Sequence, residues 1–291
     1  MIVVTGATGF TGSYVCALLA ERGLPFRAVI RNPAKGEFLK RLGAETSIAT
    51  FEDLPALTGA MKGCQVLLNV ASLGFGHAEN FIAAAKEAGI RRAVFVSTTA
   101  LFTKLPARTK LVRLAAEDSI MASGLDWTIL RPTMIYGSAA DRNIYRLLRL
   151  LKRFPIMPVP GDGQRLQQPV HVSDVAKAVV DAAFAKMTVG RAYNIPGREP
   201  LTFDALIDYA SAALHRRVWK VHFPIQPVIA AFRLYERLVP RPFIKVEQLL
   251  RLTEDKAFDY AEATRDFGYR PLSFQMGVER MVRELRAQGM I

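Results

Sequence analysis

The sequence predicts an α/β fold in which a doubly wound parallel sheet is joined to a small, mostly helical C-terminal lobe. Three observations carry this prediction. Short continuous apolar runs alternate with helical periods over residues 1–135. A glycine-rich turn over residues 6–12 follows the first apolar run directly. After Pro132 the pattern changes to longer helical segments broken by stretches rich in proline and glycine.

The first part of the chain predicts buried strands separated by helices. We expect strands at 2–5, 26–30, 65–69, 93–97 and 127–130, and a weaker one near 45–49. We expect helices at 14–21, 36–42, 54–61, 78–88 and 110–122. Continuous apolar strands separated by helices indicate a parallel sheet that is covered on both faces. Residues 1–135 should therefore form one core.

Residues 136–291 are expected to form mainly a substrate-binding lobe, with about 165–196 returning to the core. The patterns predict helices at 141–154, 172–185 and 200–214, and a strand at 191–195. Thr202 is the expected N-cap of the third of these helices. Residues 155–163 are rich in proline and glycine and are expected to form a loop. The remainder is predicted to be helical with proline breaks.

The composition excludes several classes of protein. Apolar residues make up 51% of the 291, enough for a sizeable core, so disordered and collagen-like chains are excluded. Two cysteines and four scattered histidines give no disulfide framework and no metal-ligand spacing, so no metal is expected. The chain begins in an apolar strand and has no run of 18 apolar residues, which predicts a cytoplasmic location.

The net charge of +13 is spread along the chain. Without an arginine-rich tail or zinc-finger spacing, it does not point to a nucleic-acid partner. Residues 141–154 form a basic amphipathic helix, and residues 215–251 add eight basic residues and two acidic ones. Three explanations stay open: a solvated face, a cleft for an anionic substrate, or peripheral contact with an anionic membrane.

The turn after the first strand has the spacing of a dinucleotide-binding motif. Gly6 would permit the tight turn, Gly9 would let the backbone approach a pyrophosphate, and Gly12 would let the helix pack close to the sheet. The free N–H groups at the helix start would then meet the phosphates. We expect the intervening residues to line the same site: Thr8, Phe10 and Thr11.

The segment TGATGFTG resembles the short-chain dehydrogenase/reductase superfamily, in its extended or atypical branch of epimerase/dehydratase-like proteins. Residues 170–176 resemble the family's opening of a late helix, and 259–271 the C-terminal signature of sugar-nucleotide epimerases and dehydratases. The resemblance implies a Rossmann fold with a nicotinamide dinucleotide at the strand ends. It also implies further cofactor contacts at the ends of the fourth, fifth and sixth strands: Val70, Ala71, Ser72, Ser97 and Pro132.

The end of the second strand favours NADP(H) over NAD(H). An acidic residue there would accept hydrogen bonds from a ribose 2′-hydroxyl, but none occurs from Gly23 to Gly36. Arg31 ends the strand and Lys35 follows it, and a guanidinium can grip a 2′-phosphate with two hydrogen bonds. The alternative for Arg31 is an ordinary solvated charge.

The resemblance also implies a Ser or Thr followed by a YxxxK pair, and here the pattern departs. Thr99 occupies the hydroxyl position. The tyrosine and lysine positions hold Thr109 and Arg113, and no tyrosine lies between Tyr14 and Tyr136. A threonine cannot replace a phenol as proton donor. The catalytic candidates are therefore Thr99, Lys110 as a substitute acid one turn before Arg113, and Arg113 itself.

These observations predict an NAD(P)-binding oxidoreductase of the atypical or extended type, with NADP(H) preferred and NAD(H) possible. The alternative is a cofactor-binding sensor or assembly subunit without turnover. A third reading is a basic surface-binding protein that uses the fold as a scaffold. The substrate should be a small molecule, such as a sugar nucleotide if it is anionic, with a quinone or another carbonyl compound also open. A homodimer is compatible with the sequence.

Overall fold

The structure is a computed structural model that describes residues 1–105, 108–224 and 254–291, together with 226, 227, 229, 235, 239 and 250. The chain after residue 214 was predicted to be helical with proline breaks. It is helical at Ala261–Phe267 and Phe274–Ala287, but the prediction is wrong at Trp219–Phe223, which forms a strand by pairing with a distant segment. Most of the basic segment 215–251 lies outside the described residues.

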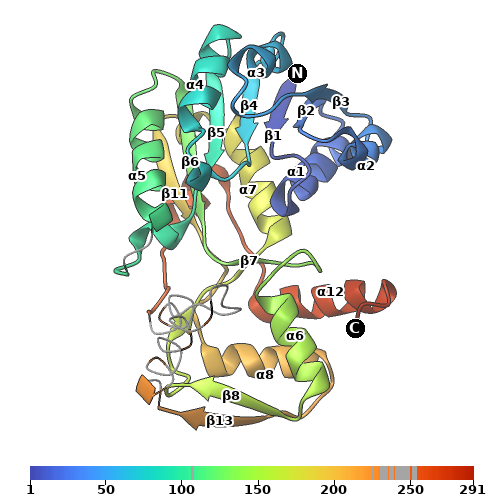
Figure 1. The fold of residues 1–291 in the computed structure, drawn as a ribbon, viewed down its shortest axis with the longest axis vertical. Coiled ribbons are helices and arrows are strands. Elements are labelled where there is room, and N and C mark those ends of the chain that lie inside the picture. The colour runs from blue at the N-terminus through green and yellow to red at the C-terminus, as the bar shows by residue number, and fades with distance from the viewer. Residues whose placement is uncertain are drawn as a thin grey trace.

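Seven parallel strands form the main sheet in the order β11-β6-β5-β4-β1-β2-β3 (Figure 1). The strand order reverses between β1 and β4, which is the switch point of a doubly wound sheet and the usual place for a ligand. The predicted fold class is thereby confirmed. The strands are β1 (Ile2–Thr5), β2 (Phe26–Ile30), β3 (Glu45–Ile48), β4 (Val66–Asn69), β5 (Arg92–Val96), β6 (Asp126–Pro132) and β11 (Arg191–Ile195).

Helices cover both faces of this sheet, because alternate strand residues are apolar on each side. Val4 and Ala28 pack towards the face of α1 (Phe10–Glu21), α2 (Glu37–Arg41), α7 (Val172–Phe184) and α11 (Ala261–Phe267). Val3 and Val29 pack towards the face of α3 (Leu54–Met61), α4 (Ala78–Glu87) and α5 (Arg108–Met121). The carboxyl ends of the central strands therefore open onto one edge between two helical layers.

A third apolar core lies below the sheet in the view of Figure 1. It is built by α6 (Ile144–Arg153), α8 (Phe203–Ala213) and α12 (Phe274–Ala287). The parallel pair β8 (Ile156–Pro160) and β13 (Trp219–Phe223) closes its far side. Two short pairs join the regions: β7 (Ile135–Tyr136) with β10 (Val170–His171), and β9 (Leu166–Gln167) with β12 (Leu201–Thr202).

The strands and helices expected in the first 135 residues are present, with shifted ends. The helix predicted from Tyr14 begins at Phe10, so the glycine turn runs straight into α1. The loop predicted for 155–163 is wrong, because Ile156–Pro160 forms β8. Two prolines hide this strand, since they remove backbone donors but fit an outer strand of a two-stranded sheet. β11 joins the main sheet beside β6, while the boundary expected at residue 135 stays a prediction.

Candidate functional site

The glycine turn between β1 and α1 can be formed only by glycine at two positions. Gly6 has φ +73°, and a Cβ there would lie 2.6 Å from the backbone nitrogen of Ala71. A Cβ on Gly12 would lie 2.1 Å from the carbonyl oxygen of Gly6. The Gly9 N–H donates to that same carbonyl at 2.9 Å. These contacts leave a side-chain-free cradle, which is what the backbone approach of a pyrophosphate requires.

The start of α1 provides a positive end beside this cradle. Gly9 is the N-cap, and within the described residues no side chain caps the helix. The first N–H groups of a helix have no partner within it, and together with the dipole they favour an anion. Thr8 is exposed, while Phe10 and Thr11 are half-buried, so the predicted residues of the turn lie at the rim of the sheet.

A buried polar contact holds the ends of β1 and β4 together. The Thr5 hydroxyl donates to the side-chain carbonyl of Asn69 at 2.5 Å, and the Asn69 amide donates to the Ala71 carbonyl at 3.2 Å. The Val70 N–H donates to the Thr5 carbonyl at 3.1 Å. This places Ala71 against the glycine turn, as expected. Ser72 follows and caps the short helix η2 (Leu73–Phe75). The Thr5–Asn69 pair was not anticipated from the sequence.

Two hydroxyls lie where β5 ends beside β6. Ser97 is buried, and its Oγ has no hydrogen-bond partner among the residues that the structure describes. Thr99, at the start of the short helix η3 (Thr99–Phe102), donates to the Pro132 carbonyl over 3.4 Å. The predicted residues Ser97, Thr99 and Pro132 are thus brought together. Burying a hydroxyl without a hydrogen-bond partner costs folding free energy. The Ser97 hydroxyl is therefore a candidate for a hydrogen bond to a bound molecule.

The two cations predicted on α5 contact the loops after β4 and β5. The Lys110 ammonium donates to the Thr103 carbonyl at 2.6 Å, just after η3. Arg113 donates to the Thr109 hydroxyl at 2.9 Å. Its guanidinium lies against Gly74 of η2, where an added Cβ would be 3.1 Å from Nη2. α5 therefore faces the same edge of the sheet as the glycine turn and Thr99.

A buried ion pair near Thr99 was missed by sequence reasoning. Arg131, in β6, donates from Nε and Nη2 to the carboxylate of Glu117 on α5. Its guanidinium also lies 5.5 Å from the centroid of the Phe102 ring. The available signal was an arginine directly after the apolar run Ile129–Leu130, because an arginine that is buried there needs a counter-charge.

The Arg31 side chain lies on the surface at the end of β2. Its guanidinium is 5.6 Å from the centroid of the Phe51 ring, while Lys35 ends the short helix η1 (Pro33–Lys35) and is exposed. The carboxyl group of Glu52 also lies here, 3.3 Å from His77. Hydrogen bonds from its own backbone and from Thr50 lower the pKa of Glu52, and the charges of His77 and Arg31 add to this. Glu52 is a further residue of this region that the sequence did not predict.

Other residues with reactive side chains are buried. Tyr136 is fully buried beside His171 and Phe274, and burial raises its pKa. His171 is the N-cap of α7, and burial lowers its pKa to about 4. Cys16 is buried as well, which raises the pKa of its thiol to about 12.

Neither a metal-binding cluster nor a membrane-spanning helix occurs among the described residues. No group of three or more His, Cys, Asp or Glu side chains in the described ranges could hold a metal ion. None of the described helices has the length and apolar character needed to span a bilayer.

Similarity to known protein sequences centres on this region. The model of a protein family described as NAD(P)H-binding matches residues 6–186. The mitochondrial NADH dehydrogenase (ubiquinone) 1 alpha subcomplex subunit 9 of Arabidopsis thaliana is 28% identical, over 87% of this chain and 69% of that protein. Quinone oxidoreductase 2 of Escherichia coli is 36% identical, over 71% of this chain and 72% of that protein.

Solved structures share the fold over nearly the whole chain. A nucleoside-diphosphate-sugar epimerase from Pseudomonas aeruginosa has a TM-score of 0.80 at 16% identity, over 100% of this chain and 98% of that one. An NADPH-dependent quinone oxidoreductase from Escherichia coli has a TM-score of 0.75 at 22% identity, over 98% of this chain and 100% of that one. These structures confirm the expected likeness in fold to epimerase/dehydratase-like proteins.

Proposed function

We propose that this chain, which belongs to the NAD(P)H-binding family, is an NADP(H)-dependent oxidoreductase. Its substrate would be a small carbonyl compound, and a quinone is the first candidate. One observation carries this proposal: the glycine cradle, with its close contact between Gly6 and Ala71, opens at the same sheet edge as the orphaned hydroxyl of Ser97. A cradle alone would serve binding. A cradle beside an unpaired buried hydroxyl would serve both binding and chemistry.

The residues present fit a nicotinamide dinucleotide. The cradle of Gly6, Gly9 and Gly12 and the N-terminus of α1 would hold the pyrophosphate. Arg31 and Lys35 would pair with a 2′-phosphate, with the Arg31 guanidinium positioned by the Phe51 ring. Val70, Ala71 and Ser72 would line the cofactor where β4 ends. When bound, the reduced nicotinamide supplies a hydride.

The protein's own groups would orient the carbonyl and deliver a proton. The Ser97 hydroxyl, which has no partner among the described residues, would donate a hydrogen bond to a carbonyl oxygen. The Thr99 hydroxyl would do the same by exchanging its 3.4 Å hydrogen bond to the Pro132 carbonyl for one to the substrate. The Lys110 ammonium donates one of its three N–H groups to the Thr103 carbonyl. The other two would be available to pass a proton to the oxygen of the product. Arg113 stays protonated and would hold a ribose or phosphate oxygen.

A quinone is favoured as substrate by the relative from Escherichia coli that carries that activity in its name at 36% identity. A nucleoside diphosphate sugar is the second substrate class, supported by the epimerase fold and the net charge of +13. These two classes differ in charge and shape, so a substrate series distinguishes them directly.

A second function is favoured by a specific feature of α5. This helix carries Thr109 and Arg113 where a catalytic tyrosine and lysine are expected, and Tyr136 is buried. A protein with this site could bind NADP(H) without turnover and act as a sensor or an assembly subunit. The similarity to a subunit of a mitochondrial NADH dehydrogenase (ubiquinone) supports the same alternative.

Steady-state oxidation of NADPH with a series of quinones, simple ketones and sugar nucleotides tests the proposal. The wild-type protein should reduce at least one quinone. Thr99→Val and Lys110→Met should lower kcat about 10²-fold or more with little change in NADPH affinity, since they remove oriented donors. Thr46→Val, on the remote strand β3, is the matched control and should leave kcat unchanged. NADPH binding without turnover of any carbonyl compound would establish the non-catalytic alternative instead.

A further inference from the structure

The two-stranded sheet β8–β13 has an inverted pattern of polar and apolar side chains. Along β13, Trp219, Val221 and Phe223 alternate with Lys220 and His222. In a sheet with one covered face, the apolar set normally points to the core and the polar set to solvent. On β13 the polar side chains point to the lobe and the apolar ones to solvent, so the exposure of the apolar side chains needs an explanation.

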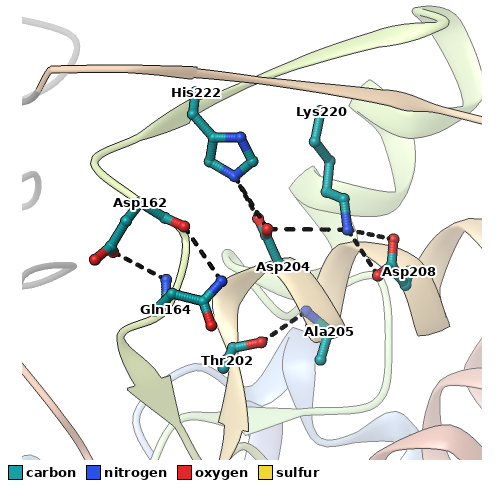
Figure 2. A network of polar contacts seen from close by, with 8 residues as sticks. All are labelled: Asp162, Gln164, Thr202, Asp204, Ala205, Asp208, Lys220 and His222. Carbon is teal, nitrogen blue, oxygen red and sulfur yellow. Dashed lines mark hydrogen bonds and ion pairs between the residues drawn. The ribbon is translucent and has the colours of Figure 1, made fainter.

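The polar set of β13 points towards the lobe. Figure 2 shows Lys220 and His222 directed at α8. The Lys220 ammonium lies 2.7 Å from the Asp208 carboxylate, and His222 Nε2 lies 3.0 Å from Oδ2 of Asp204. Asp204 is held in turn against the turn at Gly163, whose carbonyl accepts its N–H at 3.1 Å. The Lys220 ion pair and the His222 hydrogen bond fix which face of the sheet turns inward.

The outer face is therefore apolar on both strands. Trp219 stands opposite Ile156, and Val221 stands opposite Pro158, in the parallel register. The exposed fractions are 76% for Trp219, 54% for Ile156 and 52% for Val221. Single exposed apolar side chains are ordinary, but contiguous ones in register form a patch that marks an interaction site.

Four cations flank one end of this face. Lys152 and Arg153 precede β8, and Arg216 and Arg217 precede β13; all four are exposed. Because the strands run parallel, both basic pairs lie at the same end of the sheet. Phe154, also exposed, lies between the first pair and the strand, with the Arg153 guanidinium 5.5 Å from its ring centroid.

We propose that the outer face of β8–β13, formed by Ile156, Pro158, Trp219 and Val221 with Phe154 at its basic end, docks on an anionic lipid bilayer. Tryptophan and aliphatic side chains enter the interfacial layer, and neighbouring Lys and Arg side chains bind anionic headgroups. The outer positions of both strands carry no acidic side chain, and the chain as a whole has a net charge of +13. This inference is independent of the proposed reductase activity.

Flotation of the full chain with vesicles tests the proposal. One set contains equal parts phosphatidylglycerol and phosphatidylcholine, and the other contains phosphatidylcholine alone. Binding to the anionic vesicles at low salt is expected, with loss as salt rises. Trp219→Ser/Val221→Ser should weaken binding at least about tenfold, and so should Arg216→Glu/Arg217→Glu.

Matched controls distinguish binding through this face from non-specific binding of the protein to membranes. Phe184→Ser/Met187→Ser removes side chains that are 55% and 59% exposed at the end of α7 and in η4 (Lys186–Thr188). Lys40→Glu/Lys62→Glu makes the same charge change on the sheet domain. Both controls should bind like wild type. Equal losses in controls and test variants would overturn the proposal. So would absence of binding to anionic vesicles, including the case in which Trp219→Ser instead abolishes a dimer seen by light scattering.

Discussion

Arg131 at the end of β6 makes a two-pronged contact with Glu117 of α5. Nε lies 3.1 Å from Oε1 and Nη2 lies 2.5 Å from Oε2. The Glu117 side chain is 3% exposed and the Arg131 side chain is 19% exposed, so the pair is largely shielded from water. The contact fixes α5, with Lys110 and Arg113, against the strand whose end accepts the Thr99 hydrogen bond.

Removing one charge of this pair should destabilise the fold. Glu117→Gln leaves the partly buried Arg131 guanidinium without a counter-charge. This should cost about 3 kcal/mol of unfolding free energy, the lower end of the range for a fully buried pair. Urea denaturation measures the loss. Glu284→Gln breaks the exposed pair with Arg280 on α12 and serves as the control, with an expected loss below about 1 kcal/mol. Similar losses in the two variants would contradict the structural role of the buried pair.

Alanine at Gly12 should abolish dinucleotide binding and lower stability. Its Cβ would lie 2.1 Å from the Gly6 carbonyl oxygen, so the turn must open. Gly59→Ala is the matched control, because a Cβ there meets nothing within 4 Å inside α3. That change should stabilise by up to about 1 kcal/mol through helix propensity. Thermal unfolding with and without NADPH reports both effects, and an NADPH-induced stabilisation that survives Gly12→Ala would exclude the turn as the binding site.

Replacing Arg31 by aspartate should change cofactor preference. A lost charge-assisted contact to a 2′-phosphate costs about 1.5–3 kcal/mol, or roughly 10–100-fold in NADPH affinity. NADH lacks this phosphate and should lose little. Lys40→Asp, exposed on α2, controls for general electrostatics. Parallel titrations with both cofactors decide the matter, and equal losses for NADPH and NADH would remove the role assigned to Arg31.

Asp174 should give the protein a characteristic dependence on pH. Burial raises the pKa of this carboxyl from 3.8 to about 6, although the Leu272 N–H, which donates to it, opposes the shift. Between these values the folded state binds more protons than the unfolded state. The stability from Asp174 is thus present at low pH and is lost as the pH rises through about 6.

Asp174→Asn keeps an acceptor for Leu272 but cannot ionise. Relative to wild type, it should be more stable at pH 7 than at pH 4 by up to about 3 kcal/mol. Burial lowers the pKa of His171, so its contribution to stability rises with pH, opposite to that of Asp174. His171 is present in both proteins, so its contribution cancels in this difference. Asp118→Asn, at an exposed position of α5, should show no such difference. Urea unfolding at the two pH values makes the comparison, and a pH-independent effect of Asp174→Asn would contradict the raised pKa.

Local sequence signals were sufficient for most of the fold. Apolar runs such as Ile2–Thr5 are long enough and close enough to glycine turns to identify buried parallel strands. The turn at Gly6 identifies the edge of the sheet at which folds of this class usually hold their ligands. β8 and β13 were missed because their pairing is non-local, and because Pro158 and Pro160 give β8 the composition of a loop.

The parts of the site that depend on tertiary contact could not be predicted. Glu117 and Arg131 are 14 residues apart and meet only when α5 packs on β6. Glu52 reaches the Arg31 region from the segment after β3, although no acidic residue lies near Arg31 in sequence. In each case the charged residue is visible in the sequence, but its position relative to the site depends on how the elements pack.

The most direct test of the account is a fluorescence titration of the purified protein with NADPH and with NADH. The glycine cradle and Arg31 predict saturable binding of NADPH that is at least about tenfold tighter than binding of NADH. Tight binding of NADH alone would contradict the role of Arg31 but leave the cradle in place. Failure to bind either cofactor would contradict the central claim that this edge of the sheet is a nicotinamide-dinucleotide site.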